Sequence, residues 1–170
     1  LPLWTPSMPK AYNASAKVRN GVSDGLKVVY FPSCLNQMMG TDKASSGLRP
    51  LAEEMTSLLN KAGYEVIFPK NMDSLCCGTI WESKGLPDIA MKKVKELENA
   101  LWEASEGGKY PVVCDQSPCL HRMKQHISKV ELYESTEFIW KFLKDRLTFR
   151  QTDTPVALHL TCSTRLFWRI

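Results

Sequence analysis

The regular part of the chain opens with the stretch KVVYF at residues 27–31, which ends shortly before Cys34. A short run of β-branched and aromatic residues predicts a buried strand. Apolar residues then recur at helical spacing over residues 51–62, with a proline before the first turn and a glycine after the last. Residues 64–68 form another apolar run and predict a second strand. Because strand, helix and strand form the repeating unit of parallel sheets, this stretch predicts an α/β fold.

The same alternation continues towards the C-terminus. The further predicted elements are a helix over 90–104, a strand over 110–114, a helix over 118–127, a strand over 130–133, a helix capped by Ser135 and a last strand over 155–159. We therefore expect a Rossmann-like layer, with a mostly parallel sheet of about four to five strands and helices on both faces.

Composition and charge exclude several classes of protein. Hydrophobic residues make up 44% of the 170-residue chain and charged residues 24%, which is typical of a globular protein with its own core. The net charge of +4 is spread over both halves, so we expect no nucleic acid partner. No uncharged apolar run approaches the ~20 residues that span a bilayer, so we expect no transmembrane segment. A chain with such a core does not need its six cysteines as a disulfide framework, which favours a reducing, cytoplasmic location.

Three segments are expected along the chain. Residues 1–25 combine proline, glycine, serine and asparagine without periodicity and predict a linker or docking arm. Residues 26–153 would form a first α/β half, and residues 154–170 the start of a truncated second half. The second half is inferred because VALHLTC at residues 156–162 parallels VVYFPSC at residues 28–34. The chain opens on a leucine without a leader, so we expect an excised piece of a longer protein.

The cysteines share a position in the predicted fold, because each lies at or just beyond the end of a predicted strand or at the start of the following helix. They are Cys34, Cys76, Cys77, Cys114, Cys119 and Cys162. In open parallel sheets, ligands bind beyond the carboxyl ends of the strands. We therefore expect the thiols to gather at one edge of the sheet.

The string Cys76-Cys77-Gly78 is the most specific chemical signal. Successive side chains diverge, so adjacent cysteines cannot readily bind one zinc ion through both sulfurs. A polynuclear iron–sulfur cluster removes this difficulty, because neighbouring thiolates can bind different irons. Gly78 would let the backbone approach the cluster, where amide groups can donate hydrogen bonds to sulfur.

Three further cysteines would complete the site: Cys34, Cys114 and Cys119. Five thiolates exceed the four that a standard cubane cluster or a structural zinc requires, which favours an unusual cluster or one cysteine kept for chemistry. Cys114 ends a buried strand and is equally suited to a place in the core. Cys162 lacks partners, so a structural role is favoured over a second site.

These motifs resemble a known family. Cys34, the Cys76-Cys77-Gly78 string and CDQSPC at residues 114–119 resemble one motif of the cysteine-rich CCG domain. That domain occurs in heterodisulfide reductases, in the iron–sulfur subunit of glycolate oxidase and in the C-terminal part of FAD-linked D-lactate dehydrogenase. The family carries the motif twice, on two similar α/β halves, and binds iron–sulfur clusters or, in some members, zinc. The Met8-Pro9 linker also resembles the joint that follows a ferredoxin-like segment in the long dehydrogenases.

The resemblance implies an iron–sulfur electron-transfer domain, of 4Fe–4S or related type, in a flavin-dependent 2-hydroxy-acid dehydrogenase. Electrons would pass from FAD, held elsewhere in the parent protein, through ferredoxin-like domains to this site and on to a quinone or other acceptor. The metal ligands would be Cys34, Cys76, Cys77 and Cys119, with Cys114 near. The fragment alone would not be catalytic, and the parent complex could attach peripherally to the inner face of a membrane.

Two departures from the family pattern leave alternatives open. The usual closing Cys-x-x-Cys is here Cys114-x4-Cys119, so either cysteine could be the ligand, and Cys119 within Ser-Pro-Cys fits the pattern better. Cys162 resembles the opening of a second motif whose own Cys-Cys-Gly is absent. The alternative functions are a zinc-binding or metal-free docking module of the same oxidoreductase, and a thiol–disulfide reductase domain with a low-pKa thiol among the five.

Overall fold

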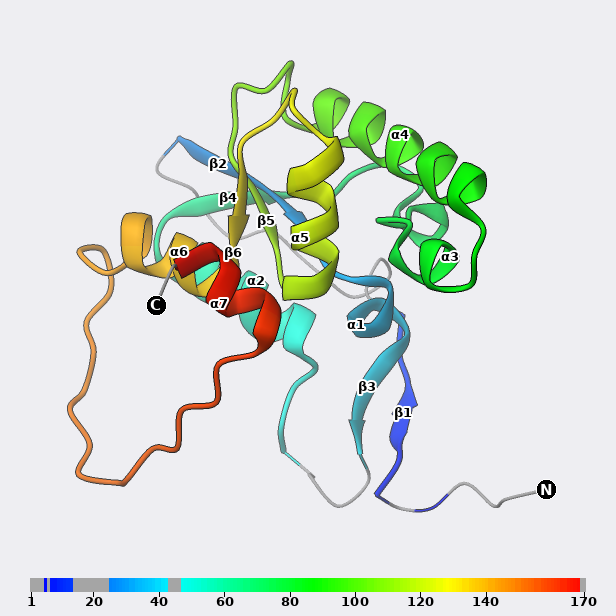
Figure 1. The fold of residues 1–170 in the computed structure, drawn as a ribbon. Helices are drawn as coiled ribbons and strands as arrows, with labels where there is room; N and C mark the ends of the chain where they lie inside the picture. Colours follow the sequence, from blue (N-terminus) through cyan, green and yellow to red (C-terminus); the bar gives the residue numbers. More distant parts are fainter. Residues whose placement is uncertain (1–4, 6, 14–24, 43–46, 169–170) are drawn as a thin grey trace.

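The centre of the protein is a four-stranded parallel sheet with the strand order β4-β2-β5-β6 (Figure 1). The computed structural model describes residues 5, 7–13, 25–42 and 47–168. The strands of this sheet are β2 (Leu26–Phe31), β4 (Tyr64–Ile67), β5 (Val112–Cys114) and β6 (Leu132–Glu134). The α/β class and the parallel sheet predicted from the sequence are therefore confirmed.

Helices cover both faces of the sheet, as expected. On one face lie α2 (Leu51–Lys61), α6 (Ser135–Phe138) and the π-helical turn η3 (Ile139–Leu143); on the other lie α4 (Pro87–Ala104) and α5 (Ser117–His126). The fully buried β2 side chains alternate between the two cores. Val28 and Tyr30 pack with α2, whereas Val29 and Phe31 pack with α4 and α5. This alternation explains why the strand is apolar throughout rather than on one side.

The strand order places a topological switch between β2 and β5. The chain runs from β2 to β4 on one side, and then returns to add β5 on the other side. In the register of the sheet, Phe31 at the end of β2 pairs with Cys114, which in turn pairs with Glu134 at the end of β6. Ligand sites in open α/β sheets lie outside the strand ends at such a switch.

Four short helices and strands that precede α4 were not predicted. They are β1 (Pro9–Ala11), α1 (Cys34–Met38), β3 (Met39–Asp42) and α3 (Thr79–Ser83), and a 3₁₀ turn, η2 (Met72–Ser74), precedes α3. β1 and β3 form an antiparallel pair that extends from the main sheet beyond α1 (Figure 1). The segment predicted as an arm thus contains a strand that pairs with the chain itself. Leu3 and Trp4, two large apolar residues of the predicted arm, lie outside the described residues.

The predicted strand over residues 155–159 is wrong. This segment has no place in either sheet of the described chain, and Val156 and Leu158 are each 82% exposed. A β-prone pattern becomes a strand only where neighbouring backbone supplies hydrogen bonds and a second layer buries the side chains. The chain then enters α7 (Cys162–Trp168), so Cys162 begins a helix but does not follow a strand.

The predicted cap of α6 is also shifted by one residue. Glu134, rather than Ser135, caps this helix, because its carboxylate accepts hydrogen bonds from the amides of Thr136 and Glu137. Among the described residues, the helices lack the combination of length and apolar character that crossing a bilayer requires.

Asp115 ties the ends of the two central strands together, and its replacement by alanine should destabilise the sheet. Its Oδ1 accepts from the amide of Ser33 at 2.8 Å, and its Oδ2 accepts from the hydroxyl of Tyr30 at 2.7 Å. Ser33 is 1% and Tyr30 0% exposed, so Asp115→Ala leaves two buried donors unpaired. We expect a loss of about 2–4 kcal/mol of unfolding free energy in urea titrations.

Tyr30→Phe serves as the matched control, because it removes one donor and leaves Ser33 paired. It should cost about half as much as Asp115→Ala. Equal losses for the two variants would show that Asp115 contributes nothing through Ser33.

Candidate functional site

Three of the cysteines are positioned by the strands β2 and β5 and by the helices that begin just after them. Cys34 is the first residue of α1, directly beyond β2, and Cys114 is the last residue of β5. Cys119 lies in the first turn of α5. All three therefore lie at or just beyond the ends of β2 and β5, at the switch between these strands; the sequence predicted one edge of the sheet but not the strand order.

The remaining pair reaches the site through the loop between η2 and α3. Gly78 caps α3 with φ of 86°, a left-handed conformation that favours glycine. Its amide donates to Cys76 Sγ at 3.4 Å. A Cβ on Gly78 would lie 2.6 Å from the carbonyl oxygen of Ala90 and 3.0 Å from Nε of Arg122. Gly78 thus allows the Cys76-Cys77 loop to pack directly against α4 and α5.

Cys77 is the centre of the thiol group. Its Sγ lies 3.2 Å from Thr79 Oγ1, and the thiols of Cys119 and Cys76 donate hydrogen bonds to it. These hydrogen bonds, Cys119 first, lower the pKa of Cys77 well below its ordinary value despite burial. The same hydrogen bonds, together with burial, raise the pKa of Cys119 and of Cys76. The three sulfurs therefore lie close enough to interact, with Cys77 at the centre.

Cys34 and Cys114 complete the group of five. Burial and then the charge on Cys77 raise the pKa of Cys34. Burial, followed by the carboxylate of Asp115, raises the pKa of Cys114, with Cys77 again among the contributing charges. Cys114 Sγ also donates a long hydrogen bond to the carbonyl of Gln116 at 3.8 Å. All four other thiols are thus close enough to Cys77 to interact with its charge.

The group extends from the core to the surface. Cys114 is 0% and Cys77 4% exposed, Cys76 and Cys119 are half-buried, and Cys34 is exposed. One side of the group is therefore shielded from water while the other can be reached from outside.

Cys162 does not join this group, although its helix lies beside α5. Hydroxyl contacts of 3.1 Å and 2.8 Å link Thr161 and Ser163 to Ser117, the first residue of α5. These contacts hold α7 beside the start of α5, two residues before Cys119, while Cys162 itself is exposed.

The five cysteine sulfurs are chemically suited to bind a metal ion or a cluster as thiolates. In this structure, however, they interact with one another. Within the described ranges, no group of three or more Cys, His, Asp or Glu side chains stands ready to hold a metal ion. The gathered side chains are soft sulfur donors of the type that zinc and iron–sulfur clusters prefer. Binding would replace the contacts among Cys77, Cys76 and Cys119 by bonds from sulfur to metal.

Sequence reasoning missed two residues beside the thiols. Arg122 has a side chain only 4% exposed and pairs with Glu82 of α3, and Thr79 contacts Cys77. The spacing contained a signal for Arg122, because residues three apart share a helix face and Arg122 follows Cys119 by three.

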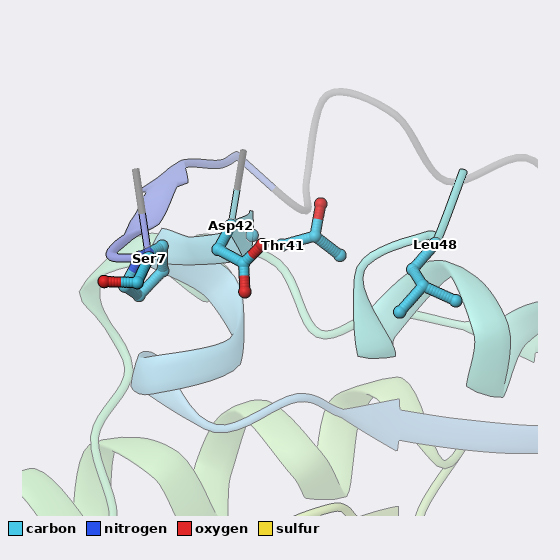
Figure 2. Close-up of a pocket in the computed structure, with 6 residues that line it drawn as sticks. Ser7, Thr41, Asp42 and Leu48 are labelled. Atoms are coloured by element: carbon cyan, nitrogen blue, oxygen red, sulfur yellow. The ribbon is translucent and has the colours of Figure 1, made fainter. Parts of the chain in front are cut away.

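Two of the pockets in the described part of the chain illustrate what lies away from the thiols. One of about 280 Å³ adjoins the pair β1 and β3, with no cysteine among its described lining residues; Figure 2 shows Ser7, Thr41, Asp42 and Leu48 around it. The other, of about 430 Å³, is lined by four α2 residues together with Asp115, Ser135 and Ile139. Neither contains a thiol of the five-cysteine group.

Comparison with known proteins gives one match. The family model of the CCG cysteine-rich domain matches residues 28–124, a range that contains Cys34, Cys76, Cys77, Cys114 and Cys119. Neither the curated proteins nor the solved structures yield a match. The match covers more than half of the chain and is consistent with a domain that binds iron–sulfur clusters or metal. The chain belongs to the CCG cysteine-rich domain family.

Proposed function

We propose that this chain is an iron–sulfur electron-transfer domain of a larger oxidoreductase. The observation that carries the proposal is the convergence of four other thiols on Cys77 at the switch point of a parallel sheet. Four of them, Cys34, Cys76, Cys77 and Cys119, would hold the cluster, and the fully buried Cys114 would be a fifth ligand or a core neighbour. A bound cluster supplies reversible one-electron transfer.

The residues of this chain would control the environment of the cluster. The buried positions of Cys77 and Cys114 exclude water from one side, and the amide of Gly78 is placed to donate to a ligand sulfur. Burial and hydrogen bonds to sulfur are the means by which proteins adjust cluster potentials. The exposed Cys34 side would face the electron partner.

The parent protein is proposed from the family resemblance. It would be a flavin-dependent 2-hydroxy-acid dehydrogenase of the D-lactate or glycolate type, located in the cytoplasm or peripherally at the inner face of a membrane. FAD and ferredoxin-like domains would lie in other parts of that protein, and a quinone or another acceptor would receive the electrons.

The division of the chain is also a proposal: a linker over 1–25, a first half over 26–153 and the start of a second half over 154–170. Its support is a repeated cap. Ser33 Oγ accepts from the amide three residues on at 3.3 Å, and Thr161 Oγ1 accepts from its own third neighbour at 3.3 Å. In both places the hydroxyl residue directly precedes a cysteine that begins a helix.

The test is anaerobic reconstitution of the purified chain with ferrous iron and sulfide. A brown protein with sulfur-to-iron charge-transfer absorbance and several irons per chain is the expected result. A colourless protein that retains one zinc, or no metal, would overturn the assignment and favour the docking module.

A thiol–disulfide reductase is the second candidate, because the lowered pKa of Cys77 provides the low-pKa thiol that such chemistry uses. Its weakness is access, since Cys77 is only 4% exposed. Rapid labelling of Cys77 by iodoacetamide in the native, metal-free chain would favour this candidate over the cluster domain.

A further inference from the structure

The feature that leads beyond the thiols is a buried cation behind the Cys76-Cys77-Gly78 loop. The Arg122 side chain is 4% exposed and lies among α3, α4 and α5. Its Nη1 pairs with the Glu82 carboxylate of α3, and its Nη2 lies 3.9 Å from Met91 Sδ of α4. A guanidinium is always charged, so this position adds a full positive charge to the interior.

One donor of this guanidinium is left over. Among the described residues, Arg122 Nε is fully buried and has no hydrogen-bond partner. An unpaired buried donor costs about 1–3 kcal/mol, more when it belongs to a charged group, so folded proteins rarely keep one without a use. Glu82, the partner on the other side, is 56% exposed, so solvent weakens its compensation of the charge.

The leftover donor adjoins the cysteine site. The Cβ position of Gly78 lies 3.0 Å from Arg122 Nε, and Gly78 directly follows Cys77. Arg122 also lies one helical turn beyond Cys119 on α5. The cation therefore adjoins two of the positions that carry thiols, at a place where glycine leaves room for it.

We propose that Arg122 is the built-in countercharge of the cysteine site and favours the more negatively charged state of its occupant. This inference rests on the proposed function, because a thiolate-bound cluster carries net negative charge that grows on reduction. Arg122 is a positioning residue in this scheme, since it acts through the field at the sulfurs and through the unpaired Nε donor. Glu82 opposes Arg122 by neutralising part of its charge.

The two partners should therefore shift the midpoint potential of the reconstituted cluster in opposite directions. Arg122→Met removes the charge and keeps the volume, and should lower the ratio of reduced to oxidised cluster at fixed potential about tenfold, or about 59 mV for one electron. Glu82→Gln leaves the Arg122 charge uncompensated, and should raise the same ratio about threefold. Arg122→Lys keeps the charge and should restore most of the potential lost in Arg122→Met.

The matched control is Glu103→Gln. Glu103 forms an exposed ion pair with Lys70 near the end of α4, about 18 Å along the helix axis from Met91. Glu103→Gln removes the same charge as Glu82→Gln, but at a position far from the cysteines, and should leave the midpoint potential unchanged. Because the Glu82 side chain is half-exposed, Glu82→Gln should fold even if Arg122→Met does not.

Two results would overturn the proposal: potentials of the Arg122 and Glu82 variants that equal the Glu103 control, or shifts of both in the same direction. A wild-type chain that takes up no iron would instead contradict the proposed function. In that case the effect of the Arg122 charge is tested by titrating the chain with Zn²⁺ alone. Arg122→Met should weaken Zn²⁺ binding about tenfold, and Glu82→Gln should not weaken it. Unchanged Zn²⁺ affinity in Arg122→Met would overturn the inference by this second route.

Discussion

Replacing Cys77 with serine is expected to reduce the iron bound after anaerobic reconstitution at least tenfold. Cys77 Sγ is the atom that the thiols of Cys119 and Cys76 contact, and it lies 3.2 Å from Thr79 Oγ1. A serine hydroxyl is a harder and less acidic ligand, so it does not replace a thiolate on iron. Iron and acid-labile sulfide per chain provide the measurement.

Cys162→Ser is the control for this experiment. Cys162 is exposed and lies beyond the residues that match the family, so its replacement should leave the iron content at the wild-type level. Wild-type iron content in Cys77→Ser, or equal losses in both variants, would contradict a cluster centred on Cys77.

Gly78→Ala is expected to destabilise the fold by at least about 3 kcal/mol. Two costs combine at this position: a side chain in the left-handed region, at φ of 86°, and a Cβ that would lie 2.6 Å from the backbone oxygen of Ala90. Backbone on α4 cannot yield as a flexible side chain can, so the loop that carries Cys76 and Cys77 must move. Urea unfolding measures the loss, and weaker metal uptake should accompany it.

Gly85→Ala separates the two costs. Gly85 also has a positive φ, of 75°, but no atom lies within 4 Å of its Cβ position. It should lose only about 1 kcal/mol, which is the cost of the backbone conformation alone. If Gly85→Ala and Gly78→Ala lose the same stability, the close approach to Ala90 has no energetic importance.

The helices and strands that were predicted correctly are those in which the spacing of apolar residues matches the faces that the fold buries. β2 is apolar throughout because both of its faces are covered, and α4 shows its apolar stripe because Val94, Leu97 and Leu101 face one core. The five-residue helices α1 and α3 were missed, since one and a half turns are too short for a periodic pattern. Residues 155–159 show the opposite failure: their apolar pattern predicted a strand, but no strand of the described part of the chain pairs with them.

The gathering of the thiols was predictable for the same topological reason as the sheet. Cysteines placed after the strands of a parallel sheet must meet at its carboxyl edge, and the structure brings four of them near Cys77. The spacing could have placed Arg122 on the helix face of Cys119, but the partners of Asp115 and Arg122 were not predictable, because they are residues distant in the chain. Asp115 binds Tyr30 and Ser33 across the sheet, and Arg122 meets Glu82 from another helix.

The strand order also determines when the site can exist during synthesis of the chain. β2 is the first strand of the main sheet to leave the ribosome, yet its neighbour β5 and the first turn of α5 follow only after β4, α3 and α4 are complete. At ribosomal speeds of ~5–20 residues per second, Cys119 is synthesised several seconds after Cys34. During that interval the early thiols lack their partners and are open to oxidation or to stray metal ions. Under the proposed function, loading of the site would therefore follow translation of α5, and a chain truncated before that helix would have no complete site to load.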